Sequence, residues 1–107
     1  MAVLAETEPV PLRQDEDGVI RVGGTRVTLD TVLAAYAQGS TPEQIAQDYS
    51  ALQTADIYAA IAYYLRHRDE VEEYLQRRLR LADEARRELE ARFPREGIRE
   101  RLESRLR

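Results

Sequence analysis

The chain has 107 residues and no cysteine, which indicates one small domain with an appendage and excludes disulfide scaffolds and thiolate chemistry. The formal net charge of −4 hides an asymmetry, because residues 1–65 contain three arginines against nine acidic residues, whereas residues 66–107 contain thirteen arginines against eleven. No basic segment followed by an apolar run opens the sequence, and no apolar stretch is long enough to span a bilayer, so we expect a cytoplasmic protein with no membrane association.

Short β-strands are predicted near the N-terminus. Residues 10–13 suit a first strand, and the polar segment 14–18 ends in a glycine, as turns often do. Two alternating apolar runs, 19–22 and 25–29, flank the Gly-Gly pair at 23–24, which can adopt the two positive φ angles of a type I′ turn. The pattern predicts a tight hairpin whose buried face carries Ile20, Val22, Val27 and Leu29.

A first helix is predicted over about residues 31–38. Asp30 is its expected N-cap, because a carboxylate at that position accepts backbone N–H groups of the first turn. Gly39 suits the left-handed conformation that closes many helices. The face expected to be buried carries Val32, Leu33 and Tyr36.

A second short helix is predicted over about residues 42–48, where proline in the first turn is well tolerated. Two capping boxes are available, since a Ser or Thr cap pairs with a Glu or Gln three residues later. The two alternatives are Ser40 with Glu43 and Thr41 with Gln44, and the buried residues are Ile45 and Ala46.

A third helix is predicted to begin near Ala55 with Thr54 as its cap. Ile57, Ile61 and Leu65 lie four residues apart and form its expected buried stripe. No glycine or proline occurs between residues 54 and 93, so this helix either runs on or breaks near residues 67–68. The spacing of Asp69 and Glu72 matches a capping box, which favours a break.

The segment 70–93 is predicted to be a strongly charged amphipathic helix that ends before the Pro94 and Gly97 region. Beyond it, a second short basic segment repeats an apolar residue every four positions. An apolar stripe on a lone helix has to pack against its own core, a second copy or another protein. The residues of the two stripes are Val71, Leu75, Leu79, Ala82, Leu89 and Phe93, then Ile98, Leu102 and Leu106.

The expected fold class is α+β and mainly α. It combines a short N-terminal β-hairpin or meander, a tri-helical core resembling a helix-turn-helix, and a long C-terminal amphipathic helix. We expect a flexible N-terminus over residues 1–9, a domain over residues 10–68, and an extension for dimer or partner binding over residues 69–107.

Residues that carry enzyme chemistry are scarce in this chain. His67 is the single histidine, and it has no second histidine or cysteine with which to complete a metal site. The carboxylates lie beside arginines at helix-surface spacings, as on a solvated face. We therefore expect a protein that is not an enzyme and that uses no metal or other cofactor.

Several motifs together resemble a bacterial family of domains of unknown function, the one numbered 433. They are Gly-Gly-Thr-Arg-Val at 23–27, the run from Tyr36 to Ile45, Asp48-Tyr49 with Leu52, and the run from Asp56 to Tyr64. The family often has Tyr-Pro where this chain has Tyr49-Ser50, which leaves the following turn less rigid here. The resemblance implies an antitoxin of a type II toxin–antitoxin pair, encoded beside a toxin similar to a PIN-domain ribonuclease.

Operator DNA is one partner that the resemblance implies for the helix-turn-helix. In such modules the second helix of the pair enters the major groove with its N-terminal residues leading. Gln53 and Thr54 are then placed to read base edges and Tyr58 to reach a phosphate. The acidic balance of residues 1–65 opposes this, since phosphate neutralisation supplies most non-specific affinity. The cations expected to compensate are Arg21, Arg26, Arg66 and Arg68.

The toxin-like partner is expected to bind the C-terminal extension. The predicted contact residues are Val71, Leu75, Leu79, Leu89, Phe93, Ile98, Leu102 and Leu106. A homodimer that uses the 70–93 stripe is also expected, and both can hold together. The alternative function is a homodimeric helix-turn-helix scaffold or transcription regulator with no toxin partner.

Overall fold

The computed structural model describes residues 7–93 of the chain. The chain divides into two compact units, residues 1–68 and residues 69–107. The described part of the first unit contains two strands and three helices, and the described part of the second consists of one long helix, α4 (Arg68–Arg92), whose first residue belongs to the first unit. The predicted fold class, α+β with mainly helix, is confirmed.

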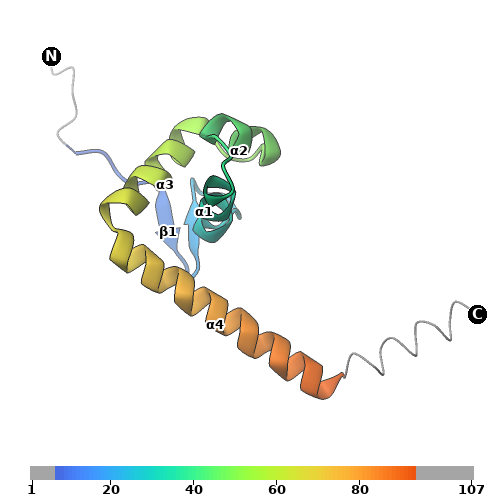
Figure 1. Ribbon diagram of the computed structural model, residues 1–107. Coiled ribbons are helices and arrows are strands. Elements are labelled where there is room, and N and C mark those ends of the chain that lie inside the picture. Colours follow the sequence, from blue (N-terminus) through green and yellow to red (C-terminus); the bar gives the residue numbers. More distant parts are fainter. Residues whose placement is uncertain (1–6, 94–107) are drawn as a thin grey trace, which may run out of the picture. The chain divides into compact units, whose positions relative to one another are not determined.

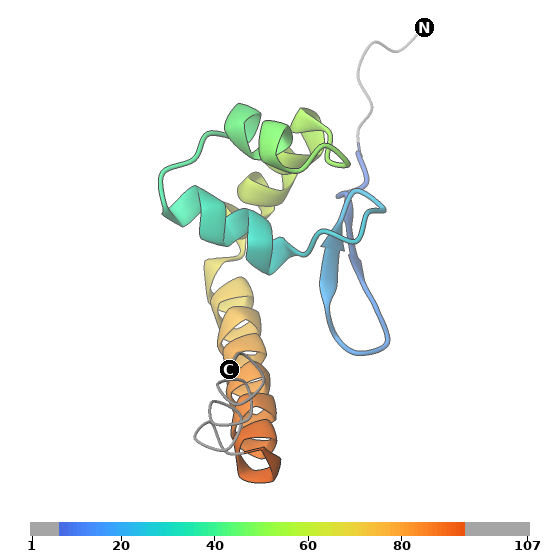
Figure 2. The same ribbon diagram turned by 90° about the vertical axis from the view of Figure 1, so that its right-hand side faces the viewer.

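The β-hairpin pairs β1 (Leu12–Gln14) with β2 (Ile20–Val22) in antiparallel orientation, with Leu12 opposite Val22. The loop between these strands is held by Asp15, whose carboxylate accepts hydrogen bonds from the backbone N–H groups of Asp17 and Val19. Figure 2 shows the two blue strands and the loop that joins them. The polar segment 14–18 therefore forms the turn of the β1–β2 hairpin. The Gly-Gly pair at 23–24 forms a separate turn that follows β2.

The predicted strand over residues 25–29 is wrong, although the turn before it forms. Gly23 and Gly24 have φ angles of 60° and 69°, and the Thr25 N–H donates to the Val22 carbonyl at 3.1 Å. After one isolated bridge between Arg21 and Thr28, the chain enters a helix. The strand stops there because the Thr28 hydroxyl accepts the N–H of Thr31 and so caps that helix.

Helix α1 (Leu29–Ala37) begins two residues earlier than predicted. Thr28 is its N-cap, so Asp30 lies inside the first turn and is not the cap. Gly39 has a φ of 100°, and its N–H donates to the Tyr36 carbonyl at 3.0 Å, which confirms it as the helix stop. Val32 and Leu33 are buried as predicted, whereas Tyr36 is 38% exposed.

Helix α2 (Pro42–Asp48) has the predicted bounds. Of the two candidate capping boxes, the one that forms joins Thr41 and Gln44. The Gln44 N–H donates to Thr41 Oγ1 at 3.2 Å, and the Thr41 N–H donates to Gln44 Oε1 at 2.8 Å. Ile45 is fully buried, which fixes the inward face of this short helix.

Helix α3 (Thr54–Arg66) follows a five-residue connection in which Leu52 is buried. Its N-cap is Gln53, which makes no side-chain capping bond, so the prediction of Thr54 as the cap is wrong. Of its predicted buried stripe, Ile57 and Ile61 are buried, but Leu65 is 46% exposed. The stripe therefore reaches solvent at the end of the helix.

The predicted break near residues 67–68 is confirmed. His67 ends α3 with a φ of −129° and a ψ of 43°, its ring stacks on Tyr63 with centroids 4.1 Å apart, and its Nδ1 lies 3.0 Å from the Tyr63 carbonyl oxygen. Helix α4 starts at Arg68, so Asp69 lies within its first turn and is not its cap. Acidic residues there favour a helix start through the helix dipole.

The core of the first unit is small and apolar. It joins residues from β2 and from all three helices, and α2 and α3 pack most extensively on each other (Figure 1). Each fully buried aliphatic side chain contributes about 1.5–3 kcal/mol relative to exposure. The largest fully buried side chains are Leu29, Ile45, Ile57, Val22 and Val32, and all come from this unit.

Candidate partner-binding surface

The apolar stripe predicted on the C-terminal helix changes character along α4. Val71 is 2% exposed and Leu75 is half-buried, so these first residues offer little surface to a partner. Leu79, Leu89 and Phe93 are 64%, 60% and 49% exposed. Of the predicted partner-binding residues, the accessible ones in the structure are therefore those from Leu79 onward. Ile98, Leu102 and Leu106 lie outside the described residues.

Tyr74 is a buried residue that the predicted stripe missed. It is 3% exposed and lies three residues after Val71, on the adjacent row of the helix. The three-residue spacing from Val71 could have predicted the burial of Tyr74, but a tyrosine among charged residues also suits a solvated helix face. The first two turns of α4 thus bury more apolar surface than the stripe alone indicated.

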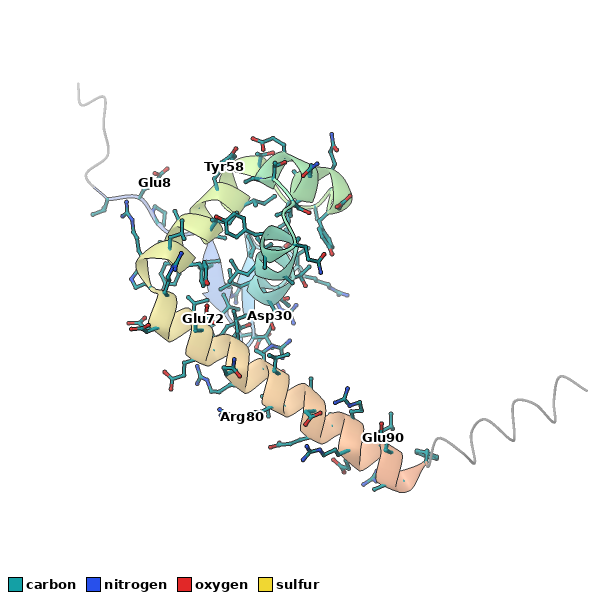
Figure 3. All side chains as sticks on the ribbon, in the orientation of Figure 1. Glu8, Asp30, Tyr58, Glu72, Arg80 and Glu90 are labelled. Carbon is teal, nitrogen blue, oxygen red and sulfur yellow. The ribbon has the colours of Figure 1, made fainter. Side chains whose placement is uncertain are left out.

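Ion pairs link charged side chains along α4. Asp83 accepts bonds from Arg86 and, at 3.1 Å, from Arg87, and Arg92 lies 3.4 Å from Glu88. The labelled Arg80 and Glu90 project from the same helix (Figure 3). Exposed pairs of this kind contribute little to stability. Their effect is to leave an apolar row bordered by locally balanced charge.

The first turn of α3 carries the residues predicted to read DNA. Gln53 is exposed and Thr54 is half-buried. Tyr58 is 51% exposed, but its hydroxyl donates a hydrogen bond to Oε1 of Glu43 in α2. This bond lowers the pKa of the Glu43 carboxyl below its ordinary value and raises the pKa of the Tyr58 phenol. Tyr58 is therefore engaged with a carboxylate where a phosphate contact was predicted.

The four arginines predicted to face phosphates differ in their surroundings. Arg21 donates from Nε to Asp15 at 3.2 Å and from Nη1 to the Arg26 carbonyl at 2.8 Å. Arg68 lies over the ring of Tyr64, with 5.7 Å from its guanidinium carbon to the ring centroid. The side chains of Arg26 and Arg66 are exposed. Two of the four guanidinium groups thus already have partners within the first unit.

The segment between Arg26 and Arg66 contains no basic residue at all, although it forms all three helices of the core. It carries four acidic residues, Asp30, Glu43, Asp48 and Asp56. A surface of this charge repels a phosphate backbone, because non-specific DNA affinity comes from neutralising phosphates with cations. The charge of the segment that forms α1 to α3 therefore disfavours contact with a phosphate backbone.

A contact between Asp56 and Gly23 was not predicted from the sequence. Asp56 lies in the first turn of α3, and a Cβ built on Gly23 would stand 2.6 Å from its Oδ2 atom. The Gly23 N–H also donates to the Pro11 carbonyl at 2.8 Å. The Gly-Gly turn therefore has a second use beyond positive φ, which is to let a carboxylate of α3 approach the backbone.

Within the part of the chain that the structure describes, no three His, Cys, Asp or Glu side chains are grouped so that they could hold a metal ion. In the same residues, no helix has both the length and the apolar character needed to cross a bilayer.

One of the comparisons with known proteins gives a match. Residues 17–64 match the model of a family described as "Protein of unknown function (DUF433)". No curated protein and no solved structure matches the chain. The matched segment begins in the β1–β2 loop and ends in α3, so it contains the Gly-Gly turn and the three core helices but not α4.

Proposed function

We propose, from the premise that the chain belongs to the DUF433 family through residues 17–64, that it is the antitoxin of a type II toxin–antitoxin pair. The described residues support this at one level, because they separate a folded helical core from a long helix with an exposed apolar row. The toxin-like partner binds that row. Residues 17–64, which match the family model, belong to the folded helical core.

The exposed row on α4 is the observation that carries the proposal. Single exposed leucines are ordinary on protein surfaces, but a row of large apolar residues along one helix face marks an interaction site. Leu79, Leu89 and Phe93 lie on one face of α4, at positions i, i+10 and i+14, and an amphipathic helix binds a hydrophobic groove through such an apolar face. The partner therefore presents an apolar groove, and its edges face the mixed acidic and basic residues that pair with one another beside the row.

A nuclease similar to a PIN domain fits this description. Such an enzyme has an acidic metal-binding pocket, and an arginine from the antitoxin placed in that pocket would block it. The arginines suited to this role follow Phe93, in the part of the chain outside the described residues. The row on α4 then supplies affinity, and the basic tail supplies inhibition.

Operator DNA is a less favoured partner of the helix-turn-helix. The three core helices carry no cation between Arg26 and Arg66, and Tyr58 is bonded to Glu43. We expect no retention of a promoter fragment by the free chain in a gel-shift assay at physiological salt. If the wild type shifts the fragment and the double variant Arg26→Ala and Arg66→Ala does not, operator DNA becomes the favoured partner of the core helices.

The test is co-expression of the full chain with the protein encoded by the adjacent gene, followed by a pull-down. We expect capture by the wild type and a strong loss with Leu89→Glu, because a carboxylate on the row is costly to bury. Leu81→Glu is the matched control, since Leu81 is 54% exposed on the same helix but lies off the row.

Three outcomes of the pull-down distinguish the antitoxin function from the alternative function. Loss with Leu89→Glu alone supports the proposed site. Equal capture by both variants places the toxin site elsewhere on the chain. Failure of the wild type to capture the neighbouring protein contradicts the antitoxin function and leaves the homodimeric scaffold or regulator as the better account.

A further inference from the structure

The exposed row on α4 has the spacing of a coiled-coil seam. From Leu75 to Phe93 the residues of the row are separated by four, three, four, three and four positions, which is the a/d pattern of a heptad repeat. The seam consists of Leu75, Leu79, Ala82, Arg86, Leu89 and Phe93. It runs for about 27 Å at the rise of an α-helix.

A hollow on α4 lies in the middle of this seam. It is a shallow and largely open depression on one face of the helix, lined by Leu79, Arg80, Ala82, Asp83 and Arg86. Four of these residues stand at positions i, i+3, i+4 and i+7, which is the set that forms the hole for a knob in coiled coils. The small Ala82 at its centre makes room for a large side chain from a facing helix.

We propose that a second copy of this chain fills the hollow, with the two α4 helices antiparallel and Ala82 of each copy opposite Arg86 of the other. The same register brings Leu79 opposite Leu89, and it brings Phe93 opposite Leu75, which is half-buried on its own chain. Each layer between Leu79 and Leu89 therefore pairs two apolar groups or one small residue with one large residue. The seam is thus complementary to itself.

Charge selects the antiparallel arrangement at the central layers. In a parallel pair each residue faces its own equivalent, so Arg86 would meet Arg86 and Ala82 would meet Ala82, giving like charges beside a void. In the antiparallel pair the Arg86 guanidinium enters a hole lined by Asp83, Arg80 and Arg86 of the second copy, in which Asp83 is the only opposite charge. On its own helix Asp83 already pairs with Arg86, the one cation of the seam, and with Arg87.

The flanking charges add a smaller, opposing effect. Arg78 and Arg92 of the second copy come near each other in this register, but Arg92 is paired with Glu88 on its own helix at 3.4 Å.

A seam of this length has an interface at the small end of the range, so the dimer should dissociate on dilution. A toxin that uses the same row would have to separate the two copies. The pairing itself is a property of the free chain and does not depend on the proposed toxin.

The first test is sedimentation velocity of the full chain over a dilution series. We expect a shift from twice the 12.3 kDa chain mass toward the monomer on dilution. Asp83→Arg alone and Arg86→Asp alone should each be monomeric, because each puts like charges at the central layers. An equimolar mixture of the two variants should regain the dimer, since every central pair is again of opposite charge.

Cysteine cross-linking tests the register, and the chain has no native cysteine to interfere. Under mild oxidation we expect L79C mixed with L89C to form a covalent heterodimer, while L79C alone and L81C alone stay uncross-linked. Cross-linking of L79C with itself would overturn the antiparallel register, and a wild-type chain that is monomeric at every concentration would overturn the pairing. Both leucines are well exposed, and circular dichroism checks that every variant keeps its helices.

Discussion

The helical core of the first unit and the outer part of α4 carry apolar residues at the same helical spacing, but with opposite results. Ile57 and Ile61 of α3 are 0% and 7% exposed, whereas Leu79 and Leu89 of α4 are 64% and 60% exposed. Both rows follow the 3.6-residue period. The difference shows that periodicity fixes which face of a helix is apolar, while burial depends on what the rest of the chain places against that face.

The polar contacts of the two regions differ in the same way. In the first unit they join separate elements or close turns, as Asp15 does in the β1–β2 loop and Tyr58 does between α3 and α2. On α4 the ion pairs of Asp83 and Glu88 join residues three or four apart on one helix. Contacts between elements resist local opening more than contacts within one helix, so the core should be the better protected region in hydrogen exchange.

The largest contrast is expected between Ile57→Ala and Leu89→Ala. Ile57 is fully buried, so its truncation should lower the free energy of unfolding by about 2–5 kcal/mol, a large share of the stability of so small a domain. Leu89→Ala should leave the unfolding midpoint of dilute protein nearly unchanged and weaken association instead. Urea unfolding of the dilute chain, followed by circular dichroism, measures both variants. An equal loss in the two would contradict the division into core and interface.

The next contrast lies within the Gly-Gly turn. Both glycines have positive φ, so alanine at either position costs about 1–2 kcal/mol for the left-handed backbone. Gly23→Ala should cost more than Gly24→Ala, because its Cβ would meet the Asp56 carboxylate at 2.6 Å, whereas nothing lies within 4 Å at Gly24. Thermal unfolding of both variants gives the difference.

A rescue variant identifies the cause of that difference. Adding Asp56→Ala to each glycine variant should bring their stabilities closer together, because the obstructing carboxylate is gone. If the gap between the two glycine positions stays the same, the contact with Asp56 is not its cause, and the hydrogen bond from Gly23 to Pro11 becomes the better explanation.

The sequence was most informative where a local signal acts alone. Gly39 was predicted as the stop of α1, and the Thr41–Gln44 capping box was one of two predicted alternatives, since each signal depends on residues a few positions apart. The strand over residues 25–29 and the cap at Asp30 were wrong for one shared reason, which is that Thr28 caps α1 two residues earlier. Alternation of apolar residues from Val27 to Leu29 is too short to separate a strand from a helix start.

The exposure of the apolar residues on α4 was predictable only in part, and their binding of a partner stays a prediction. The apolar stripe predicted on the 70–93 helix contains the exposed row, but the burial of Val71 and Tyr74 could not be seen from it. The contact of Asp56 with Gly23 joins residues 33 positions apart in the sequence, and no local pattern announces it. Tertiary packing decides such cases.

A smaller effect is expected from acid. The Val19 N–H donates to the Asp15 carboxylate and, with the Asp17 N–H and Arg21, holds its pKa below the ordinary value of 3.8. A lowered folded-state pKa stabilises the fold above pH 3.8, and this stabilisation is lost as the pH falls through the folded-state pKa. Asp15→Asn keeps an acceptor oxygen but removes the charge, so its deficit in urea unfolding should be full near neutral pH and vanish in strong acid.

The control for the acid effect is Asp17→Asn, which removes the same charge two residues away in the exposed part of the loop. It should change the pH dependence much less than Asp15→Asn does. A deficit of Asp15→Asn that persists unchanged in strong acid would show that the carboxylate charge is not what stabilises the β1–β2 loop.

The smallest effect is expected for Tyr58→Phe. The hydroxyl of Tyr58 is exposed and bonded to Glu43, so its loss should reduce stability only slightly, while the Glu43 pKa should rise toward its ordinary value of 4.5 because the donor is gone. Nuclear magnetic resonance titration of the Glu43 carboxyl measures that rise. A destabilisation as large as that of Ile57→Ala would mean that α2 and α3 depend on this polar bond as much as on their buried isoleucines. The contrast between an apolar core and an apolar docking row would then no longer describe how the two regions are built.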